Sequence, residues 1–459
     1  MKQTNILDRL AAAGGAVQAV ARPALQGHVA GGTGLAVEVA GLARCVTVGD
    51  RLRLQARTGQ DVPAEVVGFR AGFACAMAYG ALEGVGPGCP ATVELASPGA
   101  LTGRGSVLAV SDAWLGRVVD PLGRPLDGRG ALPQGQHRSV RAGPPAAAGR
   151  ARLGPRLDLG VRALNLFATC RTGQRLGLFA GSGVGKSTLL SMLARHTDCD
   201  VAVLALVGER GREVREFLED DLGQAGLSRS VVVVATSDSP PLMRREAAYS
   251  AMAIAEHFRD EGKSVLLLMD SVTRFCLALR EIGLAAGEPP ATRGYPPSVF
   301  AELPRLLERA GPGPEGDKVG HITALFTVLV EGDDHNEPVA DAVRGILDGH
   351  VVLDRRIGEG GRYPAIDVLR SLSRTVPGCL SPDEAMLARR ARAVLALQAE
   401  MADLVRLGAY CAGSDPAVDE AIQLAPRIEA ILCQGRDEGT PIEASFAQLR
   451  AAMGNADGA

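Results

Sequence analysis

Apolar and polar positions alternate in two different ways along this chain. Between residues 25 and 95, valines and leucines alternate with charged or polar residues in short runs that are separated by glycine or proline, as at 37–39 and 52–54. The runs at 65–67 and 91–93 continue this pattern. Such alternation predicts short strands with one buried face, and their close spacing favours a small β-barrel or sandwich.

A different pattern begins near residue 175, where unbroken apolar runs alternate with helical stretches. The runs occupy residues 176–179, 201–207, 231–235, 265–269 and 322–330. Runs of this kind are typical of strands that are buried on both faces, and their alternation with helices predicts a parallel sheet covered on both sides. We therefore predict an α/β fold for this part of the chain.

After residue 380 the pattern becomes entirely helical. Ser381-Pro382-Asp383-Glu384 has the form of a capping box with proline at the first helical position. Apolar residues at helical spacing follow, Gly408 suits the end of that helix, and further helical pattern reaches Met453. Nearer the N-terminus we predict a short helix at 5–21 and an irregular, Pro- and Gly-rich connector at 136–156.

Composition narrows the possible environments and functions. The chain has 459 residues, which predicts two or three domains, and its 46% hydrophobic and 22% charged residues are ordinary for a globular protein. A net charge of −3 argues against a nucleic-acid binder. Nine scattered cysteines without a CxxC pair predict neither a disulfide framework nor a zinc site. The absence of an 18-residue apolar run and of a signal-peptide core predicts a cytoplasmic protein.

The clearest chemical motif is a P-loop at residues 180–187. The run Ala180-Gly181-Ser182-Gly183-Val184-Gly185-Lys186-Ser187-Thr188 follows an apolar strand and opens an amphipathic helix, which is the context this motif requires. Its glycines let backbone N–H groups surround phosphate oxygens at a helix N-terminus. We expect Lys186 to reach the β- and γ-phosphates of ATP and Ser187 to bind Mg²⁺. Ala180 replaces the glycine of the strict motif, which is a small change.

Two acidic residues end buried strands downstream of the P-loop. Asp270 follows the run 265–269, where it is placed to hold the Mg²⁺ shell as a Walker B aspartate does. Glu209 follows the run 201–207, and in a parallel sheet its strand ends at the same edge, so Glu209 is a candidate base that orients the attacking water. The residues alone leave open a second interpretation, in which Glu209 forms a surface ion pair with Arg210.

A further acidic cluster follows the run 322–330 and contains Glu331, Asp333, Asp334, His335 and Glu337. A metal site is one interpretation, but the cluster lacks the spacing of an EF-hand loop. We favour a polar loop at the edge of the sheet.

The chain resembles the ATPases of bacterial type III export, relatives of the rotary ATP synthase catalytic subunit, and the flagellum-specific branch is the nearer match. Residues from about 100 to 375 carry the specific motifs. The stretches that carry the resemblance are 180–187, 208–217, 269–275, 287–290, 294–300, 330–334 and 362–367.

The resemblance implies a RecA-like P-loop core between an N-terminal β-barrel and a C-terminal helical domain. We place an N-terminal helix at 1–24, the barrel at 25–95, the ATPase domain at 96–378 and the helical domain at 379–459. The loop at 311–318 is longer than usual for the family, and Asp354 stands where many relatives carry serine.

The resemblance also assigns roles to single residues. Lys186 and Ser187 match the Walker A pair, while Asp270 and Glu209 match the Walker B acid and the catalytic glutamate. Arg210 is expected near the γ-phosphate. Two further residues are identified only by the resemblance. Arg374 matches an arginine finger that reaches the neighbouring subunit's site, and Tyr363 matches the aromatic residue of the adenine pocket.

Partners and location follow from the same resemblance. It implies a homohexamer with ATP at its interfaces, a regulator at the N-terminal helix, a coiled-coil stalk protein in the ring, export chaperones with their substrates, and a membrane export gate. The protein is expected in the cytoplasm and peripherally at the inner membrane, with no nucleic acid bound.

Three other functions remain open from the sequence. The first is the ATPase of a virulence-type injectisome, which has the same chemistry. The second is a non-catalytic nucleotide-binding ring subunit, although such a subunit typically lacks the acid at the position of Glu209. The third is a hexameric RNA translocase, which would need a basic, aromatic-bearing barrel, whereas residues 25–95 offer only Phe69, Phe73 and Tyr79.

Overall fold

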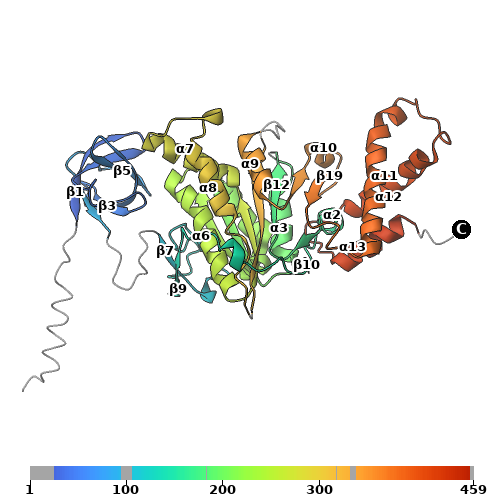
Figure 1. The fold of residues 1–459 in the computed structure, drawn as a ribbon, viewed down its shortest axis with the longest axis horizontal. Helices are drawn as coiled ribbons and strands as arrows, with labels where there is room; N and C mark the ends of the chain where they lie inside the picture. The colour runs from blue at the N-terminus through green and yellow to red at the C-terminus, as the bar shows by residue number, and fades with distance from the viewer. Residues whose placement is uncertain (1–24, 95–105, 182, 317, 331–336, 455–459) are drawn as a thin grey trace, which may run out of the picture. The chain divides into compact units, whose positions relative to one another are not determined.

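The protein is described from a computed structural model of the chain (Figure 1), which describes residues 25–94, 106–181, 183–316, 318–330 and 337–454. The predicted helix at 5–21 lies outside these residues. The chain divides into two compact units: one ends at Gly105 and includes Ile282–Glu288, and the other contains the rest. Within the described ranges, no helix has both the length and the apolar character needed to cross a bilayer. The predicted domain boundaries, including those at 95/96 and 378/379, stay predictions.

The first unit contains a closed six-stranded barrel, which confirms the predicted small β-barrel. The strand order around the barrel is β1-β2-β5-β4-β3-β6. The alternating residues behave as predicted, because Val37 and Val39 from β2 and Leu52 and Leu54 from β3 all point into the barrel core. The strands are β1 (Gln26–Thr33), β2 (Ala36–Ala40), β3 (Arg51–Gln55), β4 (Asp61–Arg70), β5 (Phe73–Ala78) and β6 (Pro90–Val93).

The second unit is built on a nine-stranded sheet, and its central strands are parallel as predicted. The order is β19-β18-β12-β17-β15-β13-β14-β8, with β16 (Gly311–Pro312) paired to β17 outside this path. Two pairs, β18 with β19 and β16 with β17, are antiparallel. The strands are β8 (Val118–Val119), β12 (Arg175–Ala180), β13 (Val201–Glu209), β14 (Ser230–Thr236), β15 (Ser264–Asp270), β17 (His321–Leu329), β18 (Gly349–Leu353) and β19 (Ile366–Ser373).

Both faces of this sheet are covered, as the unbroken apolar runs predicted. Successive residues of one strand enter opposite cores: Leu178 of β12 belongs to one buried cluster and Phe179 to the other. One face carries α2 (Arg162–Phe167) and α3 (Lys186–His196), and the other carries α6 (Pro241–Asp260), α7 (Val272–Ala286), α8 (Pro297–Leu307) and α9 (Pro338–Ile346) (Figure 1). The short helices between strands are α4 (Gly211–Glu216), η3 (Phe217–Leu222), α5 (Gly223–Ser228), η4 (Thr292–Gly294) and α10 (Arg355–Glu359).

The C-terminal part of this unit is helical, with α11 (Pro382–Arg406), α12 (Pro416–Leu432) and α13 (Ile442–Ala452). The predicted capping box is present, because Ser381 accepts from the Glu384 N–H and the Glu384 carboxylate accepts from the Ser381 N–H. Gly408 follows the end of α11 with φ +69°, as expected of a glycine after a helix. The buried Arg162 of α2 holds this part to the core through the carbonyl oxygens of Ile431 and Cys433.

The prediction of an irregular connector at 136–156 was wrong at both of its ends. Here β9 (Gln136–Ser139) pairs with β7 (Val107–Val110), and β10 (Arg156–Leu157) pairs with β11 (Cys170–Arg171). Each of these strands finds its partner more than ten residues away, so local composition rich in proline and glycine did not reveal the pairing. The 3-10 turns η1 (Asp112–Trp114) and η2 (Ala147–Gly149) complete this region.

Candidate active site

The P-loop connects the end of β12, at Ala180, to the start of α3, at Lys186. Gly183 and Gly185 have φ values of +75° and +86°, a region that side-chain-bearing residues avoid. These two glycines turn the backbone so that the loop closes immediately before a helix N-terminus, where N–H groups and the helix dipole favour an anion. The local sequence therefore builds an anion-binding loop.

The other residues of the loop take different positions. Val184 is buried beneath the loop, and Gly181 and Thr188 are half-buried. The Ser187 side chain is exposed on the first turn of α3, where its hydroxyl is free to meet a ligand. Ser182 lies outside the described residues. The predicted phosphate and Mg²⁺ contacts of these residues stay predictions.

Three charged side chains meet next to the loop. The Lys186 ammonium Nζ lies 2.5 Å from Asp270 Oδ1 and 3.2 Å from Glu209 Oε1. Lys186 follows β12, Asp270 ends β15 and Glu209 ends β13, so the carboxyl ends of three parallel strands supply the cluster. The surface-pair interpretation of Glu209 with Arg210 is thereby wrong, because the partner of Glu209 is Lys186.

Burial and charge act against each other in this cluster. Burial lowers the pKa of Lys186, but the attraction of Asp270 and Glu209 is stronger in total and raises that pKa above its usual value. Burial raises the pKa of Glu209, repulsion from Asp270 adds to this, and Lys186 opposes both. The lysine therefore stays charged, while the carboxyl group of Glu209 is a stronger proton acceptor than an exposed glutamate.

A β-bulge directs Glu209 into the cluster. The register of β13 against β14 shifts between Val207 and Glu209, and the intervening Gly208 has φ +73°. A Cβ at Gly208 would also lie 3.0 Å from the Cβ of Arg274. Gly208 is thus required both by the backbone conformation and by the close approach of α7, and the bulge turns Glu209 toward the P-loop.

Thr327 is a member of this site that the sequence did not reveal. It lies on β17, between β12 and β15, where it is fully buried. Its hydroxyl Oγ1 lies 2.8 Å from Asp270 Oδ1, the same oxygen that pairs with Lys186, and 3.2 Å from the Met269 carbonyl oxygen. The available signal was one of two threonines, Thr323 and Thr327, within the otherwise apolar run 322–330. Thr327 fixes the position of the Asp270 carboxylate.

Arg210 does not join the buried cluster. Its side chain is 78% exposed and forms an ion pair of 3.0 Å with Glu213, one turn further along at α4. The expectation that Arg210 lies near the γ-phosphate therefore has no support in the contacts of this chain and stays a prediction.

Tyr363 packs against the P-loop although it lies far away in sequence. A Cβ at Gly185 would lie 3.4 Å from the Tyr363 ring, and the residue as a whole is 46% exposed. An aromatic face that is open to solvent beside a phosphate loop suits stacking with a planar base.

The Asp354 side chain accepts a hydrogen bond of 2.8 Å from the Arg356 N–H, so aspartate here acts as the N-cap of α10.

Arg374 lies at the opposite end of the sheet from the P-loop of its own chain. Leu353, which pairs with Ala180 at the P-loop end, is aligned with Ile366, whereas Gly349 is aligned with Ser373. Gly349 and Leu353 are four residues apart on β18, which is roughly 13 Å at about 3.3 Å per residue, and the Arg374 N–H donates to the carbonyl oxygen of Asp348, one residue beyond Gly349. The exposed Arg374 therefore lies at the end of the sheet opposite to the Lys186 cluster of the same chain.

The predicted cluster at 331–337 is mostly outside the described residues. Only Glu337 is described, and it is the residue immediately before α9. The interpretation of this segment as a polar loop stays a prediction.

Comparison with known proteins agrees with this geometry. Residues 160–373 match the ATP synthase alpha/beta family, nucleotide-binding domain, and residues 380–451 match the T3SS EscN ATPase C-terminal domain. A flagellum-specific ATP synthase of Caulobacter vibrioides is 55% identical over 438 residues, which cover 95% of this chain and 97% of that protein.

Two solved structures extend the comparison to the fold. The assembled ATPase EscN from the type III secretion system of enteropathogenic E. coli has a TM-score of 0.85 at 39% identity, over 93% of this chain and 100% of that one. EscN in complex with its central stalk EscO has a TM-score of 0.82 at 38% identity, with the same coverage.

Proposed function

The chain belongs to the family of the flagellum-specific ATP synthases, and we propose that its P-loop pocket hydrolyses ATP to energise the export of flagellar proteins through a type III secretion apparatus. It is a nucleotide-binding ATPase. The observation that carries the proposal is the meeting of Lys186, Glu209 and Asp270 within 3.2 Å at the mouth of the P-loop.

Each residue of the cluster has a separate role in this proposal. Lys186 transfers its ammonium contacts from the two carboxylates to the β- and γ-phosphate oxygens, where negative charge is spread in the transition state. Glu209, freed from the lysine, accepts a hydrogen bond from the attacking water and aligns it with the γ-phosphorus. Backbone N–H groups of the P-loop hold the remaining phosphate oxygens.

The donor set also fits Mg²⁺. Asp270 offers a carboxylate whose position is fixed by Thr327, and Ser187 offers a hydroxyl at the start of α3. Oxygen ligands of this kind are those that Mg²⁺ prefers, and a bound ion would neutralise negative charge on the phosphates of ATP. Asp270 and Ser187 are the residues we propose to hold it.

Replacement of Glu209 by glutamine tests the catalytic assignment. Glu209→Gln keeps the size of the side chain and removes its basicity, so we expect turnover to fall about 10²–10⁴-fold while ATP binding is retained. Glu213→Gln is the matched control, because Glu213 is a neighbouring glutamate that faces solvent and pairs with Arg210. Steady-state ATPase assays and nucleotide-binding titrations measure the two effects. Turnover equal to that of the unmodified protein would show that Glu209 is not the base.

The position of Arg374 supports a second part of the proposal, in which active sites form between subunits of a homohexamer. Arg374 lies at the end of the sheet opposite to the site of its own chain, and a guanidinium placed at the γ-phosphate contributes about 10³–10⁵-fold in rate. EscN has been solved as an assembled ATPase. We therefore assign Arg374 to the site of the adjacent subunit.

A mixing experiment separates the two possibilities for Arg374. Lys186→Ala and Arg374→Ala are each expected to have very low turnover alone. In mixed rings, an intact P-loop from the Arg374→Ala chain meets an intact arginine from the Lys186→Ala chain, so activity returns in part. If Arg374 acted within its own chain, every chain in the mixture would remain defective and no activity would return.

Partners and location are proposed on the same family basis. EscN binds a central stalk, EscO, and we propose a coiled-coil stalk protein in the ring formed by this chain. A regulator at residues 1–24, export chaperones with their substrates and a membrane export gate are the other proposed partners. The protein would then work in the cytoplasm, peripherally at the inner membrane.

The flagellar branch is favoured over the injectisome branch by a modest margin of identity, 55% to the flagellum-specific relative against 48% to a type 3 secretion system ATPase of Xanthomonas euvesicatoria. Loss of filaments on deletion of the gene, with recovery by the intact protein but not by Glu209→Gln, would support the flagellar role.

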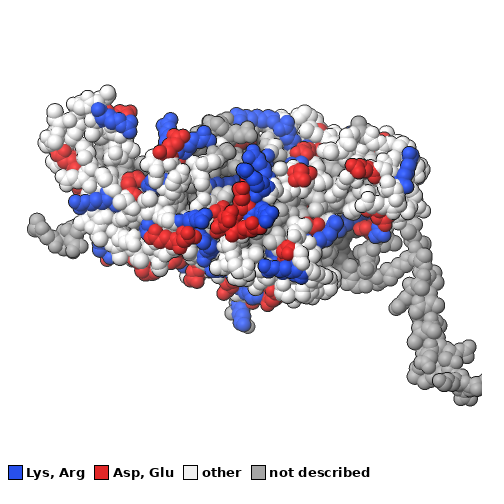
Figure 2. Space-filling view, turned by 180° about the vertical axis from the view of Figure 1, so that it is seen from behind, with Lys and Arg blue, Asp and Glu red and all other residues white. Residues whose placement is uncertain are grey.

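An RNA translocase is disfavoured because the net charge is −3 and because Lys and Arg lie beside Asp and Glu over the face shown in Figure 2. A non-catalytic subunit is disfavoured by the position of Glu209.

A further inference from the structure

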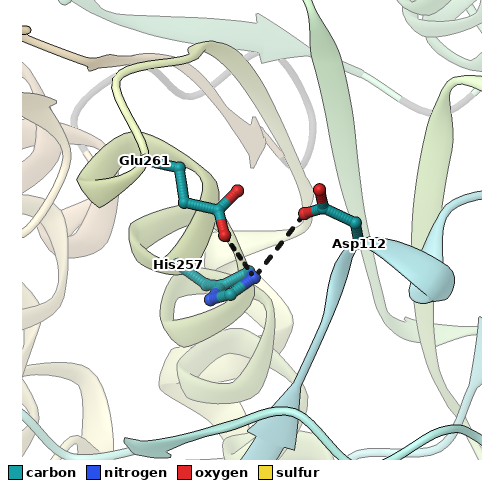
Figure 3. A group of neighbouring side chains, drawn as sticks. All are labelled: Asp112, His257 and Glu261. Carbon is teal, nitrogen blue, oxygen red and sulfur yellow. Dashed lines mark ion pairs between the residues drawn. The ribbon is translucent and has the colours of Figure 1, made fainter.

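A second group of ionisable side chains lies at the other end of β15 from Asp270. Asp112 comes from η1, His257 from the last turn of α6, and Glu261 follows the end of α6 (Figure 3). His257 Nε2 lies 3.4 Å from Glu261 Oε1 and 3.9 Å from Asp112 Oδ1. One ligand atom of each residue lies within 4.8 Å of the other two.

His257 is the residue that indicates a ligand. Its side chain is only 3% exposed. Among the described residues, neither nitrogen of its ring has a hydrogen-bond partner. A buried polar group without a partner is unfavourable, and such groups are rare in folded proteins. Figure 3 shows the ring between the two carboxylates, with Nε2 directed at the gap between them.

The separations suit a tetrahedral cation. Two ligands bound at about 2.0–2.1 Å in tetrahedral geometry lie roughly 3.4 Å apart. The distance from His257 Nε2 to Glu261 Oε1 already has this value. Asp112 Oδ1 lies 3.9 Å from the same nitrogen, and a small rotation of the exposed Asp112 side chain would bring it to this value. One imidazole and two carboxylates leave a fourth position for water, which is a donor set that zinc accepts.

The surrounding charges also favour a cation. The site lies at the C-terminal end of a 20-residue helix, where the helix dipole is negative. Burial lowers the pKa of His257 and outweighs the attraction of Glu261 and Asp112, so its ring is neutral at pH 7 and has a free lone pair. Arg138, which also faces this region, is occupied by Asp260 at 2.6 Å.

We propose that Asp112, His257 and Glu261 form a binding site for Zn²⁺ or a cation of similar preference, which ties η1 to the end of α6. Lys263 competes with the ion. Its ammonium Nζ lies 3.0 Å from Asp112 Oδ1 and 2.9 Å from a Glu261 carboxylate oxygen, so it supplies the positive charge that the ion replaces. The site thus holds either the lysine ammonium or a divalent cation.

Zinc titration of the full chain, without nucleotide or Mg²⁺, tests this proposal through two variants with opposite expected effects. His257→Gln should weaken the tightest zinc site by more than about 100-fold, because loss of a ligand exceeds the effect of losing a supporting contact. Lys263→Met keeps an unbranched apolar stem and removes the competing ammonium together with its contact over the Phe258 ring, so zinc should bind about tenfold more tightly. Isothermal calorimetry or competition with a chromophoric chelator provides the dissociation constants.

Cobalt distinguishes this site from adventitious binding to cysteines. Co²⁺ held by nitrogen and oxygen should show tetrahedral d–d absorption without a thiolate charge-transfer band, and His257→Gln should remove that absorption. Thermal unfolding provides an independent measurement, since zinc at a hundredfold excess over its dissociation constant should raise the melting temperature of the unmodified protein but not of His257→Gln. Equal zinc affinity in the two proteins, or a cobalt spectrum of thiolate type, would overturn the assignment.

Discussion

The two ends of strand β15 carry ion clusters of nearly the same composition. At the C-terminal end, Lys186 lies between Asp270 and Glu209, and at the N-terminal end, Lys263 lies between Asp112 and Glu261. Each cluster thus contains one ammonium and two carboxylates within 3.2 Å of it.

What differs is burial and the orientation of the nearest helix. The side chains of Lys186 and Asp270 are 13% and 5% exposed, against 28% and 62% for Lys263 and Asp112. The first cluster lies at the N-terminus of α3, which favours an anion, and the second at the C-terminus of α6, which favours a cation. If both proposals hold, the comparison teaches that the same charged groups serve phosphate or metal according to the helix end beside them.

The largest expected difference between the clusters is in catalysis. Lys186→Met removes a charge that is aimed at the phosphates, so turnover should fall about 10³-fold. Lys263→Met, assayed with Mg²⁺ but without zinc, should change turnover less than about twofold, because its charge is screened and remote from the P-loop. ATPase assays on both variants at equal protein concentration measure this. Similar losses in the two variants would remove the functional distinction between the clusters.

Stability should separate the same two variants in a second way. In protein without nucleotide, Lys186→Met leaves two buried carboxylates facing each other, which costs about 3 kcal/mol in the free energy of unfolding. The partly exposed pair of Lys263 contributes less than about 1 kcal/mol. Urea unfolding followed by circular dichroism measures both values. A larger loss for Lys263→Met would mean that burial does not set the strength of these ion pairs.

Thr327 sharpens the comparison, because the second cluster has no equivalent buried hydroxyl among its described contacts. Thr327→Val keeps the shape of the side chain but leaves Asp270 without this hydrogen bond. We expect turnover to fall about tenfold and the Mg²⁺ concentration for half-maximal activity to rise, as for loss of a group that orients a ligand. Thr327→Ser restores the hydroxyl and should recover most of the activity. If Thr327→Ser were as defective as Thr327→Val, packing rather than the hydrogen bond would be responsible.

Salt should produce the smallest effect. Raising ionic strength shortens the Debye length from about 10 Å at 0.1 M to about 3 Å at 1 M, and this screens exposed pairs much more than buried ones. The stability difference between the unmodified protein and Lys263→Met should therefore shrink toward zero at 1 M salt. The difference for Lys186→Met should persist. Unfolding curves at the two salt concentrations test this, and equal sensitivity to salt would contradict it.

The sequence predicted the parts of the fold that are encoded locally. The five apolar runs correspond to central strands of the sheet. They were recognisable because a strand that is buried on both faces carries few polar residues. The P-loop was recognisable because its glycines, lysine and helix start are contiguous. Asp270 and Glu209 were predictable since each ends such a run, and parallel strands bring those ends to one edge of the sheet.

What the sequence did not show depends on contacts between distant segments. Thr327 matters only because β17 lies beside β15. Asp112 and His257 are far apart in the sequence but belong to one cluster in the fold. The antiparallel pairing of β19 was likewise invisible, because its alternating pattern does not reveal its partner. Arg374 and Tyr363 entered the sequence analysis only through family resemblance.

Strand β19 has a consequence for how assembled copies would communicate. It begins three residues after Tyr363, whose ring touches the P-loop, and it ends one residue before Arg374 at the far edge. In the proposed hexamer, a single strand would therefore join the proposed base pocket of one copy to the guanidinium that we assign to the next. In a closed ring these links would all point in the same rotational sense, because the polarity of the strand is the same in every copy, and the coupling between two neighbouring sites would be reciprocal.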